Sequence, residues 1–450
     1  MKAKKILSLV LACLLLISVF AACGNSGSST STAGSTEESG TAETEKDTST
    51  SSGSKKLTIW VYGWETASAE KIMEDAETWY DETGVEIEVI SVASDSYNTK
   101  MQATLAGGDN PDLAFIDAGV LSMQLAAKDV LLGLSDYGVN DYKDLFYESV
   151  WDTMVYKDEV YGLRITSNNL ALYYNKELFD NAGLEYPTAD WTWDDLRNAA
   201  KTLTDKENGV YGLDLPVYDE SGGYCWTWLP FLWQNGGQLL NEDRTEAIVN
   251  SAEGVGALEY WRALVDDGSV PLSAAASGVN RFSSGITAMM IDGPWSLSTY
   301  IEDPNFVDKL GVAPLPQNTA QATVVGGEGV VIFSNTDYPQ EAYDYLTHLC
   351  CSDFTEVFWE NWITVPPQEG HEDFYADLDV YGEYISVFTS QMEYSQTRQF
   401  TPSWTQIEDA MALNLEAYMF GEEDDAQAAL DAAVEDINKI LAEEAEEYGD

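Results

Sequence analysis

Basic residues and histidine are scarce in this chain of 450 residues. It has 2 histidines and 22 lysines and arginines, against 77 aspartates and glutamates. Binding to nucleic acid requires a basic surface, so the charge balance argues against a nucleic-acid partner and against binding of the folded part to anionic membranes. So few histidines leave almost no material for a histidine-based catalytic group or a zinc site. We expect no catalytic residue, no metal and no cofactor, although an acidic loop leaves calcium open, and neutral ligands such as sugars fit this composition.

The chain also lacks a long apolar run. Its most apolar stretch, residues 6–20, is shorter than the roughly 20 residues that a membrane-spanning helix needs. Lysines at positions 2, 4 and 5 precede this stretch, and two alanines follow it. This pattern predicts an export signal over residues 1–22, with an uncleaved membrane anchor as the alternative.

The sequence after the apolar stretch, Phe20-Ala21-Ala22-Cys23-Gly24, resembles a bacterial lipobox, although Phe20 stands where leucine is usual. The resemblance implies that Cys23 is lipidated and becomes the first mature residue, anchored to the extracellular face of the cell membrane by its acyl chains. Residues 23–54 are almost entirely Ser, Thr, Gly, Ala and Glu, without aromatic or large aliphatic residues. We expect a disordered tether there.

Cysteine is sparse as well, with 5 residues in the chain. Apart from Cys13 and Cys23, only Cys225, Cys350 and Cys351 are present, and an odd number in an exported chain does not describe a disulfide framework. We expect Cys350 and Cys351 to be buried thiols on one helix, with a strained vicinal disulfide as the alternative.

From residue 55 onward the chain is too long for one ordinary core, so we expect two lobes. Its first part alternates strand and helix, the pattern of a parallel α/β sheet, with strands at 57–62, 85–92 and 113–116 and helices at 68–83 and 97–105. The first helix places apolar residues at helical spacing before the stop at Gly84: Ala69, Ile72, Met73, Ala76, Trp79 and Tyr80. Trp64, Asp117, and either Asp95 or Tyr97, fall at strand ends on one rim of the sheet.

The stretch RFSSGITAMMIDGPW at residues 281–295 contains a buried apolar run, 288–291, followed by a break at Asp292-Gly293-Pro294. The run predicts a strand buried inside an α/β sheet, and the break after it is expected to direct Trp295 outward. In such folds a ligand binds beyond the carboxyl ends of the strands, so Trp295 is placed to contact it. The alternative is that Trp295 caps the core.

Later segments are predicted from the same patterns. A strand is expected at 170–175, helices at 191–204, 252–267, 406–420 and 425–443, and a Gly-rich turn feeding a strand at 324–334.

In this order, six segments resemble the extracellular solute-binding protein family 1, the carbohydrate-binding components of ABC importers, whose members include maltose-binding protein. They are LTIWVYGWE at 57–65, GGDNPDLAFID at 107–117, LALYYNKELFDNAG at 170–183, NGGQLL at 235–240, the stretch ending in Gly293-Pro294-Trp295, and GGEGVVIFS at 326–334. The resemblance implies a two-lobed α/β fold of the periplasmic-binding-protein type II, with discontinuous lobes, hinge crossings and a ligand cleft between the lobes. The first lobe would comprise residues 57–164 plus 331–363, and the second 168–329 plus 365–450.

The resemblance also implies ligand-contacting positions. Trp295 matches an aromatic platform for a sugar ring, Asn168 a polar contact near a hinge, and Trp64 or Glu65 together with Asp117 first-lobe polar contacts. One of Tyr224, Cys225 and Trp226 matches a second-lobe contact, and we select Trp226. Further candidates that offer either an aromatic face or hydrogen-bonding groups for sugar hydroxyls are Glu328, Arg398 and Trp404.

The sequence thus predicts a monomeric, lipid-anchored binding protein that captures a sugar, with an oligosaccharide favoured by the 14 tryptophans, and delivers it to the permease of an ABC importer. One alternative is a binder of another solute, such as a peptide; the scarcity of basic residues at strand ends argues against a phosphate. Another alternative is a surface glycoside hydrolase, which also uses tryptophan platforms and a carboxylate pair.

Overall fold

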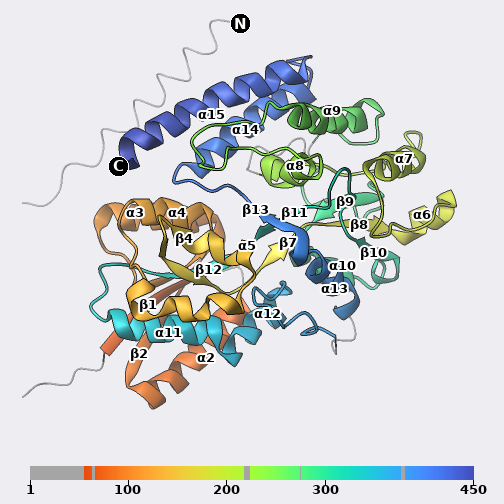
Figure 1. Ribbon diagram of the computed structural model, residues 1–450. Helices are drawn as coiled ribbons and strands as arrows, with labels where there is room; N and C mark the ends of the chain where they lie inside the picture. Colours follow the sequence, from red (N-terminus) through yellow and green to blue (C-terminus); the bar gives the residue numbers. More distant parts are fainter. Residues whose placement is uncertain (1–54, 63–65, 217–222, 274, 377–380, 450) are drawn as a thin grey trace, which may run out of the picture. The chain divides into compact units, whose positions relative to one another are not determined.

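The computed structural model of the chain describes residues 55–62, 66–216, 223–273, 275–376 and 381–449 (Figure 1). The predicted export signal, Cys23 and the tether lie outside the described residues, as do Trp64 and Glu65. Residues 53–450 form one compact unit. No helix within the described ranges combines the length and the apolar character needed to cross a membrane.

The first sheet has five strands in the order β2-β1-β3-β12-β6. These strands are β1 (Lys55–Tyr62), β2 (Val85–Val92), β3 (Leu113–Asp117), β6 (Gly162–Arg164) and β12 (Glu328–Ile332). β1 runs parallel to β2 and β3, which confirms the predicted alternation of strand and helix. β12 runs antiparallel to β3 and β6, because the chain returns to this sheet at the end of β3, where Glu328 pairs with Asp117.

Helices and one small hairpin pack around the first sheet. They are α2 (Thr66–Thr83), α3 (Ser94–Gly107), α4 (Val120–Ala127), α5 (Glu148–Trp151), α11 (Pro339–Cys351), α12 (Glu356–Trp362), and the hairpin of β4 (Val155–Tyr156) and β5 (Glu159–Val160). In α2 the small and aliphatic residues Ala69, Ile72 and Ala76 are buried, and Gly84 follows the helix with a φ of +74°. Met73 and Tyr80, assigned to the same apolar face by their spacing, are instead 43% and 46% exposed.

Two further sheets have three strands each. One has the order β10-β8-β9 and is antiparallel throughout, with β8 (Ala171–Asn175), β9 (Met289–Asp292) and β10 (Leu310–Ala313). The other has the order β13-β11-β7, with β7 (Asn168–Asn169), β11 (Thr323–Gly326) and β13 (Ser395–Thr397). The apolar run before Trp295 is therefore a strand, β9, as predicted, with Met289 and Met290 buried.

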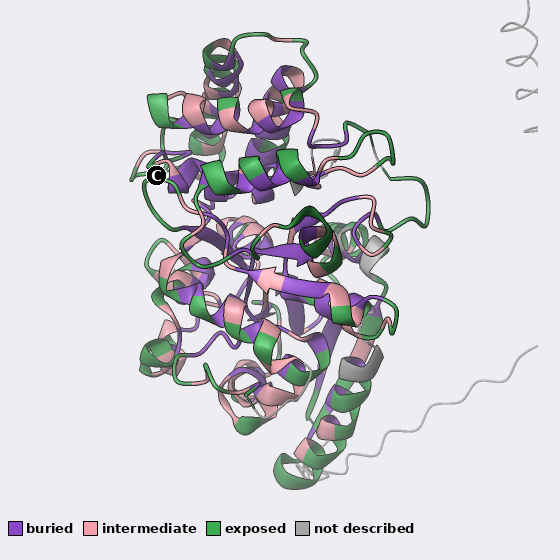
Figure 2. Cartoon of the chain, turned by 90° about the vertical axis from the view of Figure 1, so that its right-hand side faces the viewer, coloured by how far each residue is buried: buried purple, intermediate pink, exposed green. Residues whose placement is uncertain are grey.

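The remaining helices pack around these two sheets and bury the largest aromatic side chains. They are α6 (Lys176–Ala182), α7 (Trp193–Leu203), α8 (Gly223–Gln234), α9 (Ala252–Asp266), α10 (Leu297–Ile301), α13 (Gly382–Ser390), α14 (Trp404–Met419) and α15 (Ala426–Tyr448). Figure 2 shows buried residues concentrated on the strands and exposed residues along the outer sides of helices. α7 begins two residues later than predicted because Thr192 caps it: the Asp195 N–H donates to Thr192 Oγ1, and the Asp195 carboxylate accepts the Thr192 N–H.

The chain crosses between the first sheet and the β13-β11-β7 sheet at adjacent positions. β6 ends at Arg164 and β7 begins at Asn168, while β11 ends at Gly326 and β12 begins at Glu328. β7 and β11 are paired, so the two crossings lie side by side, and a third segment joins them where Val365 bridges Ser167. The strand expected after the Gly-rich turn in 324–334 is present as β12. The turn itself is shorter than expected, because residues 324–326 are the end of β11, where Val324 and Val325 are buried.

Gly327 forms the junction of the second crossing. Its φ is +122°, and a Cβ there would lie 2.6 Å from Arg164 Nη2 and 2.7 Å from the Thr166 carbonyl oxygen. Glycine is required at this position by both backbone conformation and space.

The three cysteines within the described ranges are free thiols. Cys350 and Cys351 end α11, which confirms the expected helix and rules against a vicinal disulfide; Cys350 is fully buried and Cys351 partly so. Burial raises the pKa of the Cys350 thiol well above its ordinary value, so this thiol is chemically quiet.

Candidate functional site

Two acidic side chains face each other where β3 ends and β12 begins. Asp117 is the last residue of β3, and Glu328, the first residue of β12, is its direct partner in the antiparallel ladder. Like charges directly opposite each other in a sheet are destabilising unless neighbouring groups compensate them. The neighbours of this pair therefore define the chemistry of the site.

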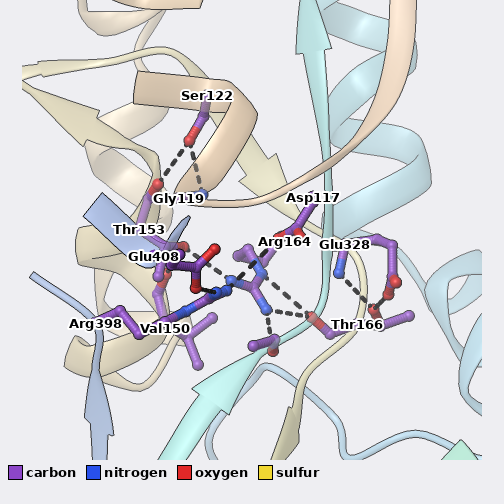
Figure 3. A network of polar contacts seen from close by, with 11 residues as sticks. Asp117, Gly119, Ser122, Val150, Thr153, Arg164, Thr166, Glu328, Arg398 and Glu408 are labelled. Carbon is purple, nitrogen blue, oxygen red and sulfur yellow. Dashed lines mark hydrogen bonds and ion pairs between the residues drawn. The ribbon is translucent and has the colours of Figure 1, made fainter. Parts of the chain in front are cut away.

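Glu328 is held by the first crossing segment. Thr166 Oγ1 donates to the Glu328 carboxylate at 2.5 Å and accepts the Glu328 backbone N–H at 3.0 Å (Figure 3). Through these two bonds the first residue of β12 is fixed to the segment between β6 and β7.

Arg164 is a buried cation beneath the same crossings, and sequence analysis did not single it out. Its guanidinium donates to Thr153 Oγ1 at 2.9 Å, to the Thr166 carbonyl at 3.0 Å and to the Gly326 carbonyl. Burial lowers its pKa to about 10, against the opposing effect of Glu328 and Asp117. Arg164 thus ties both crossing segments together; the only signal in the sequence is a basic residue at the end of a buried strand.

Arg398, which follows β13, approaches Asp117 from the other side. Its Nη1 lies 2.8 Å from Glu408 Oε1 and its Nη2 lies 3.9 Å from Asp117 Oδ1 (Figure 3). The guanidinium carbon is 4.6 Å from the ring centroids of both Trp226 and Phe400. Arg398 is only 6% exposed, yet within the described chain its Nε has no hydrogen-bond partner. A buried donor without a partner is costly, so an acceptor that reached this nitrogen would remove that cost.

Asp117 is the open member of this group, with 53% of its side chain exposed. Desolvation by the surrounding protein raises the pKa of its carboxyl to about 6, although Arg398 opposes the rise and Glu328 and Glu408 add to it. Because half of the side chain still meets water, solvation offsets part of this desolvation. Asp117 is therefore largely ionised at pH 7 and able to accept hydrogen bonds.

Trp226 forms an aromatic wall beside Asn168. A Cβ added at Gly326 would lie 2.4 Å from the Trp226 ring and 2.9 Å from Asn168 Oδ1, so both side chains rest directly on the backbone of β11. Of the three residues considered in this stretch, Tyr224 and Cys225 are buried in the core, and only Trp226 stacks on Arg398.

Trp404 and Phe400 occupy positions that their sequence alone did not distinguish. Trp404 is 1% exposed and lies behind Arg398, with the guanidinium 5.9 Å from its ring centroid. Phe400 lies against the backbone of Gly119, at the start of α4, where a Cβ would come within 2.0 Å of its ring. Trp404 thus supports Arg398 from within the core, whereas Phe400, which sequence analysis did not single out, packs across to the first sheet.

Trp295 stands apart from this cluster, after the end of β9. It is 45% exposed, and its ring lies over Gly293, where a Cβ would come within 2.0 Å of it. Asp292 accepts hydrogen bonds from Ser296 Oγ at 2.6 Å and from the Gly293 N–H at 2.8 Å, and it also bonds the Trp295 side chain. Burial raises the pKa of the Asp292 carboxyl to about 6, against the effect of these three donors. The outward position of the indole agrees with the break predicted after β9.

The structure therefore brings together most of the predicted site residues, namely Asp117, Asn168, Trp226, Glu328 and Arg398, and adds Arg164, Thr166 and Phe400. Trp295 forms a separate exposed corner, and Trp64 and Glu65 lie outside the described residues. No group of three or more His, Cys, Asp or Glu side chains in the described ranges is arranged to hold a metal ion.

Comparison with known proteins gives consistent matches. Residues 62–349 match the family described as bacterial extracellular solute-binding protein. The chain is 24% identical over 388 residues to the arabinooligosaccharide-binding protein of Halalkalibacterium halodurans, covering 78% of this chain and 83% of the relative.

Solved structures agree in fold. An ABC substrate-binding protein of Listeria monocytogenes in complex with cycloalternan is 28% identical with a TM-score of 0.74, covering 87% of this chain and 100% of that one. The cyclic α-maltosyl-1,6-maltose binding protein of Arthrobacter globiformis is 27% identical with a TM-score of 0.77, with the same coverage of 87% and 100%. The type II periplasmic-binding-protein fold predicted from the sequence is confirmed.

Proposed function

The chain belongs to the bacterial extracellular solute-binding protein family, and on that premise we propose that it captures a sugar, and specifically an oligosaccharide, for an ABC importer. Relatives named for arabinooligosaccharide, cycloalternan and cyclic maltosyl-maltose support this ligand class. The ligand-contacting residues that we propose are Trp64, Glu65, Asp117, Asn168, Trp226, Trp295, Glu328 and Arg398, with Trp404 acting through Arg398.

The observation that carries the proposal is the grouping of Asp117, Arg398 and Trp226. Sugar recognition needs an aromatic face for the C–H side of the ring and charged groups that hydrogen-bond the hydroxyls. Here the exposed Asp117 carboxylate lies 3.9 Å from the buried guanidinium of Arg398. That guanidinium stacks on the indole of Trp226, and its Nε has no hydrogen-bond partner within the described chain. Because these groups would be left unpaired by a ligand without hydroxyls, the site favours sugars over apolar solutes.

Hinged closure explains how such a site would hold and release its ligand. In the sequence-based division, residues 57–164 plus 331–363 form the first lobe and residues 168–329 plus 365–450 form the second. Because β12 pairs with β3 and β6 from Glu328 onward, we move residues 328–330 to the first lobe of the proposal. Asp117 lies on the first and Arg398 and Trp226 lie on the second, so a ligand that contacts both stabilises the arrangement in which they are close. The closed form would then dock on the permease subunits.

Lipid anchoring belongs to the same proposal. The lipobox resemblance at Cys23 supports a monomer tethered to the extracellular face of the cell membrane by residues 23–54. In the native host, the wild-type chain should incorporate labelled palmitate, whereas Cys23→Ala, which lacks the acceptor thiol, should not. Equal labelling of both chains would contradict the anchor.

The proposed ligand class is tested by a thermal-shift screen of the purified protein against mono- and oligosaccharides, with product analysis of each mixture. A ligand that binds only the folded state raises the melting temperature by mass action. A large shift with one family of sugars, recovered intact, is the expected result. Cleavage of the sugar would indicate a glycoside hydrolase instead, and a shift with peptides alone would indicate a peptide binder.

A further inference from the structure

The outer end of the first sheet carries a groove, lined by both apolar and acidic side chains, that the proposed sugar site does not use. The groove is lined by α2 and β2. β2 is the strand at the end of the sheet order β2-β1-β3-β12-β6, and α2 lies beside it (Figure 1). The groove has a volume of about 570 Å³. Its lining comes only from these two elements: Met73, Ala76, Glu77, Tyr80, Asp81, Glu86, Ile87 and Val89.

The helix side of the groove exposes two large apolar side chains. Met73 and Tyr80 are about two helical turns apart on α2 and are 43% and 46% exposed, with Ala76 between them. These are the members of the predicted apolar face that the sheet leaves uncovered. An exposed apolar stripe on a helix marks an interaction site more often than isolated apolar residues do.

The strand side of the groove is an open edge. In the part of the chain that the structure describes, β2 pairs with β1 alone, from Val85–Lys55 through Val92–Tyr62. Its other edge therefore offers backbone N–H and C=O groups to another strand. Strand addition beside a helix uses this combination: main-chain hydrogen bonds give affinity, and one set of alternate side chains enters the groove.

The rim of the groove is acidic. Glu77 and Asp81 make no ion pair or side-chain hydrogen bond within the described chain, and Glu86 shares Lys56 with Glu88 at 3.2 Å. No lysine or arginine lines the groove. A second copy of this chain, with a formal net charge of −55, is a poor occupant for such a rim. A basic segment complements it.

We propose that this groove binds an extended segment of a basic partner protein, which adds a strand to the free edge of β2. On the side of the added strand that faces α2, apolar side chains would contact Met73 and Tyr80, and lysines or arginines in turn with them would lie at Glu77 and Asp81. The surface is distinct from the Asp117–Arg398 cluster, and the proposal does not depend on which solute that cluster binds.

The test is fluorescence anisotropy with the full-length protein and a fluorescein-labelled octapeptide in which one set of alternate positions carries valine and lysine in turn and the other set carries threonine. We expect saturable binding to the wild type that weakens by about tenfold in Glu77→Gln/Asp81→Asn and again in Met73→Ser/Tyr80→Ser. These side chains are exposed or lie at the groove rim, and unchanged circular dichroism should confirm that each variant folds. The matched control, Glu443→Gln/Glu446→Gln on α15, removes the same charge from an exposed helix and should bind within about twofold of wild type.

A second peptide separates strand addition from simple charge attraction. N-methylation at alternate residues removes the main-chain donors from one edge and keeps the charge, so it should weaken binding about tenfold when placed on the pairing edge. Equal binding of both N-methylated registers, equal losses in the α15 control, or tighter binding of a helical peptide of the same charge would each overturn the proposal.

Discussion

The cluster around Arg398 and the corner around Trp295 both combine an indole with an aspartate whose pKa is raised to about 6, but they are built differently. At Asp117 the compensating group is a buried cation, itself stacked between two aromatic rings. At Asp292 the compensation comes from neutral donors, and the indole remains open to solvent. The side chains around Asp117 and Arg398 are therefore held in place by the fold. The indole of Trp295 is instead an exposed surface that a ligand can cover.

The largest expected effect is the loss of unfolding free energy when Arg398, the buried cation of the first cluster, is removed. Arg398→Ala leaves Glu408, whose side chain is 11% exposed, as a buried charge without its partner. Such a loss costs about 3–5 kcal/mol of unfolding free energy, measured by urea denaturation at pH 7. The control Lys439→Ala breaks exposed pairs with Glu435 and Asp436 and should cost no more than about 1 kcal/mol. Equal losses in the two variants would show that Arg398 is not buried as described.

A pair of glycine substitutions compares the two indoles directly. Gly326→Ala places a Cβ 2.4 Å from the Trp226 ring, and Gly293→Ala places one 2.0 Å from the Trp295 ring. Trp226 is held by Arg398, so Gly326→Ala should lower the unfolding free energy by about 1–3 kcal/mol. Trp295 is 45% exposed and can move outward with the loss of its hydrogen bond to Asp292, so Gly293→Ala should cost about 1 kcal/mol while weakening sugar binding through the displaced ring. Thermal melts and sugar titrations measure the two effects; a larger stability loss in Gly293→Ala would reverse the comparison.

The smallest expected effect is a difference in pH dependence. A carboxyl with a folded-state pKa of about 6, above its unfolded value, binds protons more readily when folded, so its contribution to stability is present at low pH and is lost as pH rises from about 4 through 6. Asp292→Asn should therefore flatten the stability profile between pH 4 and 7. Asp117→Asn should flatten it less, because 53% of that side chain meets water. Denaturation at several pH values measures both slopes, and profiles parallel to wild type would contradict the raised values.

Local pattern was sufficient to predict much of the fold. The strand at 85–92 matches β2 residue for residue, and the predicted helices are present with ends shifted by a few residues. In these segments apolar residues recur with the period of a helix or a strand, and residues such as Gly84 mark where a helix ends. Both signals are local and do not depend on distant parts of the chain.

Features that depend on tertiary packing could not be predicted in the same way. Trp404 and Trp226 were both selected as ligand contacts, yet the first is buried where α14 packs on α8, and the second stacks on Arg398 at the site. Met73 and Tyr80 have the spacing of core residues but lie beyond the area that the sheet covers. Arg164 acts on a segment more than a hundred residues away, Gly326, which no local pattern reveals.

The central claim is that an exposed indole and the Asp117–Arg398 cluster serve one sugar ligand, and titration calorimetry of Trp295→Ala with the sugar found by the screen tests it most directly. The account predicts an affinity loss of about tenfold or more with an unchanged melting temperature, because Trp295 is 45% exposed and contributes contact area rather than core packing. The matched control Phe420→Ala removes another aromatic ring, 42% exposed, and should bind as wild type does. Full affinity in Trp295→Ala would contradict the account.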